Sequence, residues 1–279
     1  MKTILVPTDF SESAKNATEY AIKLAKELNM NLLLLHLFHA PETLPVDVPI
    51  TFYTDDIIQK EKEALLKKEA LDIQKRNGVK VSYLVKLNFA VDGILDEKAD
   101  FIVMGIQGSS NLSDVLMGSI TTSVLRESKI PVFVIPEKIK YKKPKKIVFA
   151  CDFDYQKNSN TYEILKGFAK KFDSKISVLN VTENKQLETA EETLAGKKLE
   201  QSLAHIEHGY YFHENENLVE EINEFAADQK ADIIAIVPHQ YSFVEKLFHK
   251  SISKNLAFYT HVPLFVIPDN HKSTAAFFI

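Results

Sequence analysis

The feature that most constrains the fold is an internal repeat. The segment Ile4-Leu-Val-Pro-Thr-Asp-Phe10 is matched later in the chain by Ile147-Val-Phe-Ala-Cys-Asp-Phe153. Further along, Ile130-Pro-Val-Phe-Val-Ile-Pro136 is matched by Val262-Pro-Leu-Phe-Val-Ile-Pro268. Because the same patterns recur in the same order, the sequence predicts two tandem domains of one fold. We place these domains at residues 1–138 and 145–279, joined by a linker at 139–144.

Each copy alternates short apolar runs with amphipathic stretches. The apolar runs do not alternate with polar residues, which is typical of parallel strands that helices cover on both sides. The predicted fold is therefore α/β, with two tandem doubly wound domains whose ligands bind at the carboxyl ends of the strands. In the first copy the expected strands are Ile4–Val6, Leu32–Leu37, Val79–Val85, Phe101–Met104 and Val132–Ile135.

Composition narrows the class of protein. The chain has 279 residues, of which 45% are hydrophobic and 26% charged, and its formal net charge is −4. Nucleic-acid-binding domains usually carry a basic excess, so nucleic acid is not the expected partner. A single cysteine, Cys151, and the lack of a long apolar run near the first residue predict a soluble cytoplasmic protein. The lysine-rich join at residues 138–146 is interpreted as a solvated linker rather than a grip for an anionic partner.

The glycines have a spacing that suits phosphate. Gly105 and Gly108 follow the fourth expected strand, and Gly118-Ser119 opens the last helix of the first copy. Glycine lets the backbone approach an anion, and a helix N-terminus offers unpaired amides and the positive end of a dipole. Two glycines after a strand can also form a simple tight turn. Together with Asp9 at the end of the first strand, however, the spacing predicts a phosphate cradle that is neither a P-loop nor a dinucleotide fingerprint.

These patterns resemble the universal stress protein (UspA-like) superfamily, in a tandem two-domain form. The resemblance rests on the glycine spacing and on three segments besides the closing Ile130–Pro136: Ile4-Leu-Val-Pro-Thr-Asp-Phe-Ser11, Leu34-Leu-His-Leu37 and Ala99-Asp-Phe-Ile-Val-Met-Gly105. It implies the adenine nucleotide alpha hydrolase-like fold, with a five-stranded parallel sheet per domain and pairing through the fifth strands. In one chain the two domains would make that pair, while a homodimer and an unknown protein partner stay open.

The resemblance also implies a ligand, which is ATP or a related adenine nucleotide in the N-terminal domain, with Mg²⁺ as an optional companion. Carried over by position, Pro7, Thr8 and Asp9 would lie by the base and ribose, and the Leu37 backbone would bind adenine. The remaining implied contacts, which would surround the ribose and phosphates, are Met104, Gly105, Gly108, Ser109, Gly118, Ser119 and Ile120.

The second copy departs from this pattern. Its equivalents of the three glycines are Val237, Gln240 and Lys250, and only Asp152 and Ser251 remain of the constellation. A β-branched residue where the backbone must approach a ligand blocks the family's nucleotide pose. We therefore expect no nucleotide in the C-terminal domain.

Several residues beside the motifs receive structural interpretations. His36 is expected to be a hydrogen-bonded structural histidine rather than a ligand contact, and Cys151 an inert core thiol. The histidines of the second copy lack the paired spacing of a zinc helix, so no metal site is expected. The third helix of the first copy is short, which should leave one flank of the first sheet less covered.

No residue is assigned a catalytic role. No nucleophile–base pair lies at a motif position, and no Lys or Arg lies within the first glycine motif to stabilise a transferring phosphoryl group. The sequence therefore predicts a regulatory, largely non-catalytic nucleotide-binding stress-response protein with at most slow ATP hydrolysis. The alternative is a nucleotide-independent protein-interaction scaffold.

Overall fold

The computed structural model describes residues 2–39, 55–106, 118–151, 159–182, 194–215, 217–237 and 261–268. The first half contributes strands β1 (Thr3–Pro7), β2 (Asn31–Phe38), β3 (Val81–Leu87), β4 (Phe101–Gly105) and β5 (Val132–Ile135). Its helices are α1 (Glu12–Leu28), α2 (Asp55–Asn77), α3 (Ala90–Leu95) and α4 (Ser119–Glu127).

The second half repeats this alternation. Its strands are β6 (Lys146–Ala150), β7 (Lys175–Thr182), β8 (His208–Glu214), β9 (Ile233–Ile236) and β10 (Leu264–Val266). Its described helices are α5 (Ser159–Phe172), α6 (Leu194–Leu203) and α7 (Leu218–Asp228).

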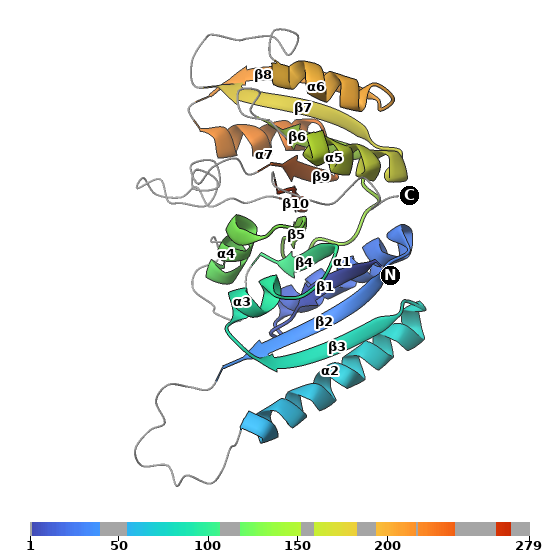
Figure 1. Ribbon diagram of the computed structural model, residues 1–279. Helices are drawn as coiled ribbons and strands as arrows, with labels where there is room; N and C mark the ends of the chain where they lie inside the picture. Colours follow the sequence, from blue (N-terminus) through green and yellow to red (C-terminus); the bar gives the residue numbers. More distant parts are fainter. Residues whose placement is uncertain are drawn as a thin grey trace.

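The strands form a single ten-stranded sheet in the order β3-β2-β1-β4-β5-β10-β9-β6-β7-β8 (Figure 1). Neighbouring strands are parallel within each half, and β5 and β10 pair antiparallel at the centre. The predicted α/β class with doubly wound parallel strands is confirmed. The fifth strands also cover each other's edges, as the resemblance implied.

Aromatic packing reinforces the central strand pair. Phe133 of β5 lies opposite Phe265 of β10, and their rings stack with centroids 4.2 Å apart and planes 7° from parallel. Phe168 of α5 packs against both rings, at 5.7 and 4.9 Å. All three side chains are fully buried, so one continuous apolar core crosses the junction between the halves.

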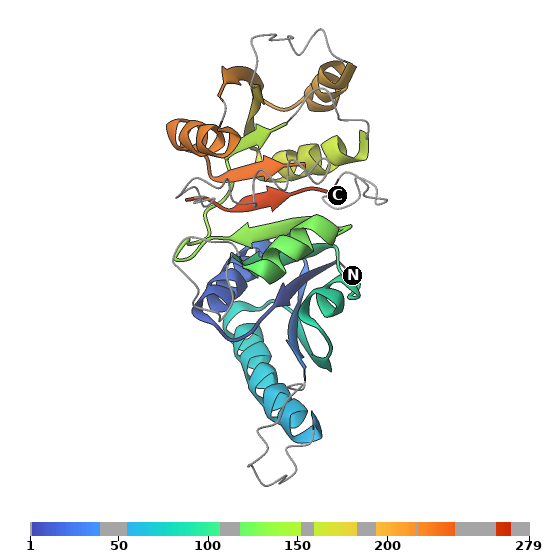
Figure 2. The same ribbon diagram turned by 90° about the vertical axis from the view of Figure 1, so that its left-hand side faces the viewer.

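Helices cover both faces of the sheet (Figure 2). The apolar side chains of α1, α2, α5 and α6 pack into the core on one face, and those of α3, α4 and α7 pack into the core on the other. Within the described residues, no helix is both long enough and apolar enough to cross a membrane.

An aspartate stands in the same place in both halves, just before the fourth strand of each. The side chain of Asp100, just before β4, accepts a hydrogen bond from the Thr3 N–H at 2.6 Å. Asp232, just before β9, accepts from the N–H groups of Lys145 and Lys146 at 2.9 and 3.0 Å. In each half, therefore, a carboxylate caps the start of the first strand.

The lysine-rich join is exposed, as expected, but it is fixed to the body of the protein. Lys142 forms an ion pair with Asp232 at 2.5 Å, and Lys143 forms one with Glu27 at 3.4 Å. The Tyr141 ring also packs edge-on against Tyr20 of α1 at 5.0 Å. These pairings neutralise part of the positive charge of the join.

The third strand and the third helix of the first half bear on two expectations from the sequence. β3 begins at Val81, whereas the sequence predicts a start at Val79. Val79 is buried, but pairing with β2 starts only after it, with the hydrogen bond from the Leu32 N–H to the Lys80 carbonyl at 2.9 Å. The third helix is short, as predicted: α3 has 6 residues, whereas α7 has 11.

Candidate functional site

The turn after β1 is held by its own side chains. The Phe10 N–H donates to Thr8 Oγ1 at 3.1 Å, and the Ser11 N–H donates to Asp9 Oδ1 at 3.0 Å. Ser11 is also the N-cap of α1, since its hydroxyl accepts from the Ala14 N–H at 3.2 Å. The turn places the exposed Asp9 at the carboxyl edge of the sheet.

Phe10 has a left-handed backbone, with φ of 65°. This conformation is uncommon for a bulky residue, and such outliers concentrate at functional positions. The Phe10 ring lies 4.7 Å from the His36 ring, and Lys62 of α2 lies over it, with Nζ 5.7 Å from the ring centroid. Sequence reasoning assigned no role to either residue: Phe10 was read only as part of the repeated segment Ile4–Phe10, and Lys62 lies in none of the motifs.

His36 fastens the turn to β2. It is buried, and its Nδ1 lies 2.8 Å from the Thr8 carbonyl oxygen, which can only accept, so Nδ1 carries the proton. Burial lowers the pKa of His36, and the positive charge of Lys62 acts in the same direction. The hydrogen bond to Thr8 and the negative charge of Asp9 oppose this shift. His36 is thus a neutral structural donor, as predicted.

The second half has the same clamp with a different side chain. Asn180 of β7 is buried and donates from Nδ2 to the Cys151 carbonyl at 3.1 Å, just after β6. The strand registers make Asn180 the equivalent of His36, and Cys151 the equivalent of Thr8. The matching runs Leu34-Leu-His-Leu37 and Val178-Leu-Asn-Val181 are the sequence signal that could have revealed this.

The backbone of Leu37 faces an open position. Pairing of β1 with β2 ends at Pro7 and Leu35, and the Thr8 N–H donates to the Leu35 carbonyl at 2.8 Å. On its other side, β2 stays paired with β3 as far as Phe38. Backbone groups of alternate residues point to opposite neighbours in a strand, so Leu37 points to the same side as Leu35. Its N–H and C=O therefore face the space beyond the end of β1.

The N-terminus of α4 lies beside the end of β4. The Gly118 N–H donates to the Ile106 carbonyl at 2.8 Å, which fixes the helix start against the strand end. Gly118 is the N-cap without a side-chain cap, and the first turn contains no acidic residue. Ser119 and Ile120 are exposed there. A helix start of this kind presents unpaired N–H groups and the positive end of the dipole.

Strand register brings these parts together. Parallel pairing of Pro7 with Leu35 puts Asp9 level with Leu37, and pairing of Leu5 with Ile102 puts Asp9 level with Ile106. Neighbouring strands lie about 5 Å apart, so the three strand ends span about 10 Å. The Leu37 backbone, the Asp9 carboxylate and the α4 N-terminus thus follow one another along the carboxyl edge of β2, β1 and β4.

Gly105 has a packing role that the sequence did not suggest. A Cβ at this position would lie 2.3 Å from Ser13 Oγ and 3.0 Å from the Ser13 carbonyl oxygen. The missing side chain therefore lets the first turn of α1 pack directly on the end of β4. The Gly105 carbonyl accepts from the Thr121 hydroxyl at 3.1 Å, which ties α4 to the same strand end.

The other expected site residues can now be placed. Thr8 and Met104 are buried, and Met104 packs into the core beneath the strand ends, while Pro7 is half-buried. Gly108 and Ser109 lie outside the described residues.

In the second half, Val237 at the position of Gly105 is buried in the core. The other equivalents all lie outside the described residues: Asp152, Gln240, Lys250 and Ser251.

The described ranges contain no group of three or more His, Cys, Asp or Glu side chains that could hold a metal ion. Asp9 is an exposed carboxylate at the strand ends. Mg²⁺ commonly takes only one or two carboxylates and completes its shell with phosphates and water. A Mg²⁺ that accompanies a phosphate ligand would therefore need few protein ligands, and Asp9 offers one carboxylate at this edge.

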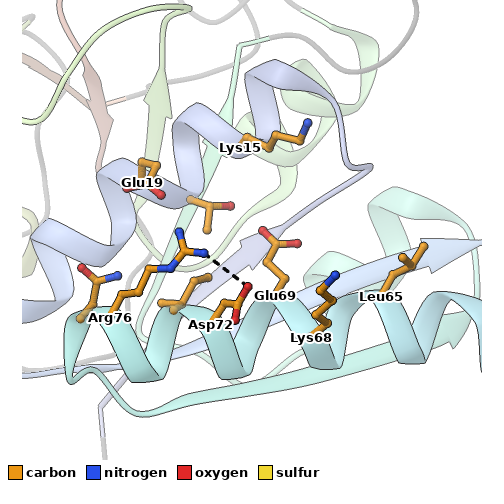
Figure 3. A pocket seen from close by; sticks show the side chains of 10 residues that line it. Lys15, Glu19, Leu65, Lys68, Glu69, Asp72 and Arg76 are labelled. Carbon is orange, nitrogen blue, oxygen red and sulfur yellow. Dashed lines mark hydrogen bonds and ion pairs between the residues drawn. The ribbon is translucent and has the colours of Figure 1, made fainter.

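A separate cleft of about 380 Å³ lies between α1 and α2 (Figure 3). None of the expected site residues lines it. Its charged lining is balanced between three cations and three anions: Lys15, Lys68 and Arg76 against Glu19, Glu69 and Asp72. Burial raises the pKa of Glu69, and the nearby Lys15 opposes that shift. With no excess positive charge, this cleft is not suited to a polyanionic ligand.

Comparison with known proteins identifies the family. The model of the universal stress protein family matches residues 1–136. Two universal stress proteins of Methanocaldococcus jannaschii are each 30% identical to this chain. One match covers 160 residues, 49% of this chain and 96% of the relative, and the other covers 151 residues, 52% of this chain and 84% of the relative.

The fold is also shared over nearly the whole chain. The crystal structure of a universal stress protein from Archaeoglobus fulgidus matches with a TM-score of 0.73 at 23% identity, over 96% of this chain and 98% of that chain. The protein therefore has the adenine nucleotide alpha hydrolase-like fold, an α/β fold with a parallel sheet in each half. The chain belongs to the universal stress protein family.

Proposed function

We propose that the N-terminal half of this chain binds ATP or a related adenine nucleotide, and that nucleotide occupancy regulates a cytoplasmic stress-response protein. The observation that carries this proposal is the alignment of three complementary groups along one sheet edge: the Leu37 backbone, the Asp9 carboxylate and the α4 N-terminus. We take residues 1–138 as the nucleotide-binding domain and 145–279 as a second domain of the same fold.

The first two groups suit a nucleoside. The Leu37 N–H and C=O offer one donor and one acceptor side by side, which matches the hydrogen-bonding edge of a purine base. Asp9 lies at the same level on the adjacent strand, and a carboxylate there can accept from ribose hydroxyls, as acidic residues do in other doubly wound sheets. The resemblance assigns these same positions to the base and ribose.

The third group suits the phosphates. The first turn of α4 lacks a side-chain cap and acidic residues, so its N–H groups and dipole favour an anion. The Ser119 hydroxyl is exposed in that turn and can add a hydrogen bond. A Mg²⁺ that accompanies the phosphates would neutralise part of their charge.

We propose a largely non-catalytic role, because no nucleophile with an adjacent base lies among the described residues of this edge. His36, the nearest candidate base, is buried, and its ring packs against Phe10. Nucleotide that binds only the folded, binding-competent conformation would stabilise it by mass action and alter the surface offered to a partner. We propose no nucleotide for the second half, where Val237 replaces Gly105.

A charge substitution at Ser119 tests the proposal. Ser119→Asp places an acid in the first turn of α4, which should stabilise the helix by about 0.3–1 kcal/mol while it repels phosphate. Ser119→Asn has nearly the same shape without the charge and is the matched control. Titration calorimetry with ATP, ADP and AMP should show that the Asp variant loses most affinity for ATP and least for AMP, whereas the Asn variant stays close to the wild type.

Because the Asp variant is expected to be at least as stable as the wild type, lost binding cannot be attributed to unfolding. Equal affinities of the Asp and Asn variants would contradict phosphate binding at α4. If the wild type gives no heat with any of the three nucleotides, the nucleotide-independent scaffold becomes the better account.

A further inference from the structure

Exposed apolar side chains gather at one end of the molecule. Among the described residues, six of the seven large hydrophobic side chains that are exposed lie on α2 or on β3 and the residues just after it: Ile57, Leu65, Leu71, Tyr83, Leu87 and Phe89. Leu87 is 50% exposed and Phe89 62%. This end carries β3, one of the two edges of the ten-stranded sheet, and the opposite edge is β8 (Figure 1).

The outer edge of β3 has backbone groups without strand partners. The Lys80 carbonyl accepts from Leu32 and the Asn88 N–H donates to Phe38, so the even-numbered residues of β3 face β2. The odd-numbered residues therefore point their N–H and C=O groups outward. The Val81 N–H donates a hydrogen bond to Gln74 Oε1 of α2 at 3.4 Å. Tyr83, Val85 and Leu87 form no outward backbone hydrogen bond within the described ranges.

The usual protections of an edge strand are weak here. Natural edges are blunted by charged side chains, proline or bulges. β3 contains no proline, and its one charged residue, Lys86, is already paired with Glu97. Of the outward N–H groups of β3, the one at Val81 is bonded to a helix, through Gln74 of α2.

We propose that β3 is the surface at which two copies of this chain associate, by antiparallel pairing of β3 with β3 about a two-fold axis at Leu84. The occupant is a second copy because the strand is complementary to itself in this register. The outward-facing residues meet one another, Tyr83 opposite Val85 and Val81 opposite Leu87, which is the condition for backbone hydrogen bonds in an antiparallel pair.

The side chains also match in this register. Apolar residues oppose apolar residues at every odd-numbered position and at Leu84 on the axis, and Lys86 faces Ser82 rather than another charge. Leu84 is half-buried on the face where the short α3 leaves the sheet less covered, so pairing would bury it further. The chain already joins its two halves by antiparallel edge pairing, at β5 and β10.

Mass measurement gives the first test. Sedimentation equilibrium of the full chain over a concentration series should show a dimer that dissociates on dilution. Tyr83→Pro removes an outward N–H and should give a monomer, and it leaves the β2–β3 ladder intact because that N–H does not face β2. Leu65→Ser, which removes an exposed apolar side chain of α2 that lines the cleft between α1 and α2 instead of the edge, should remain dimeric.

Disulfide trapping tests the register. In a Cys151→Ser background, Leu84→Cys places two thiols opposite each other on the axis at a Cα separation of about 4.5 Å, which suits a disulfide. Ser82→Cys is the matched control on the same face of the same strand, where the two thiols would lie about 14 Å apart at about 3.4 Å per residue. Mild oxidation should cross-link the first variant and not the second.

Three results would overturn the proposal. They are a wild type that is monomeric at every concentration, a dimer that Tyr83→Pro leaves intact, and cross-linking of Ser82→Cys without cross-linking of Leu84→Cys. Because none of these measurements involves a nucleotide, their outcome is independent of the proposed function.

Discussion

Gly105→Ala separates the packing role of this glycine from any role in ligand binding. A Cβ added here would lie 2.3 Å from Ser13 Oγ, 3.0 Å from the Ser13 carbonyl oxygen and 3.1 Å from its carbonyl carbon. Contacts below 3 Å force movement, and the two backbone atoms belong to the first turn of α1, which Ser11 fixes as N-cap. We expect the ligand-free protein to lose about 1–3 kcal/mol of folding free energy, the usual cost of overpacking.

Ser13 allows this clash to be dissected. Its hydroxyl is buried, and within the described residues it has no hydrogen-bond partner, so Ser13→Ala alone should cost little. Combined with Gly105→Ala it removes the shortest contact and leaves the two backbone contacts. The double variant should therefore recover part of the loss, with a coupling energy of about 0.5–3 kcal/mol, as is typical for residues in contact.

Urea denaturation of the wild type, the two single variants and the double variant, all without nucleotide, gives the four free energies. A Gly105→Ala protein as stable as the wild type would refute the packing argument. So would a Gly105→Ala loss that is the same with and without the Ser13 hydroxyl.

Two further predictions concern hydrogen bonds that fix the strand ends. His36→Leu leaves the buried Thr8 carbonyl without its donor and should cost about 1–3 kcal/mol, whereas His36→Asn, which imitates Asn180, should cost clearly less in the same denaturation assay. The pKa of His36 is lowered from 6.5 in the folded state, so on acidification the unfolded chain takes up the proton first. The contribution of His36 to the free energy of unfolding should therefore be complete above pH 6.5 and should fall as the pH drops toward the lowered pKa. His36→Asn should flatten this pH dependence. Asp232→Ala removes the acceptor of two backbone N–H groups and should cost about 2–3 kcal/mol. The control is Glu207→Ala, which loses an exposed ion pair with Lys175 and should change the unfolding midpoint little.

The sequence predicts the strands of this protein well where burial and pairing coincide. Val132–Ile135 is found at its expected bounds, because all four residues are both buried and paired. The predicted third strand begins two residues before β3. The hydrophobic pattern indicates correctly that Val79 is buried, but it does not indicate that pairing with β2 begins only at Lys80. The hydrophobic pattern of a sequence indicates which residues are buried. The residue at which a strand begins depends in addition on the hydrogen-bond register with its neighbour, which the pattern does not contain.

The candidate site shows a different limit. The positions of Asp9 and Gly118 followed from motif spacing and from the rule that strands one and four are neighbours, whereas Leu37 was implied by the family resemblance alone. The contact of Gly105 with Ser13 did not, because it joins two segments far apart in sequence and depends on how closely α1 approaches β4. The left-handed backbone of Phe10 was equally hidden, since aromatic residues carry no sequence preference for that conformation.

A crystal structure of the full chain grown with ATP tests the central claim most directly. The account predicts a purine against the Leu37 backbone and phosphate density at the N-terminus of α4 beside Ser119, with the second half empty. A nucleotide bound at the ends of β6 and β9 instead, or an N-terminal edge that stays empty at saturating ATP, would contradict it.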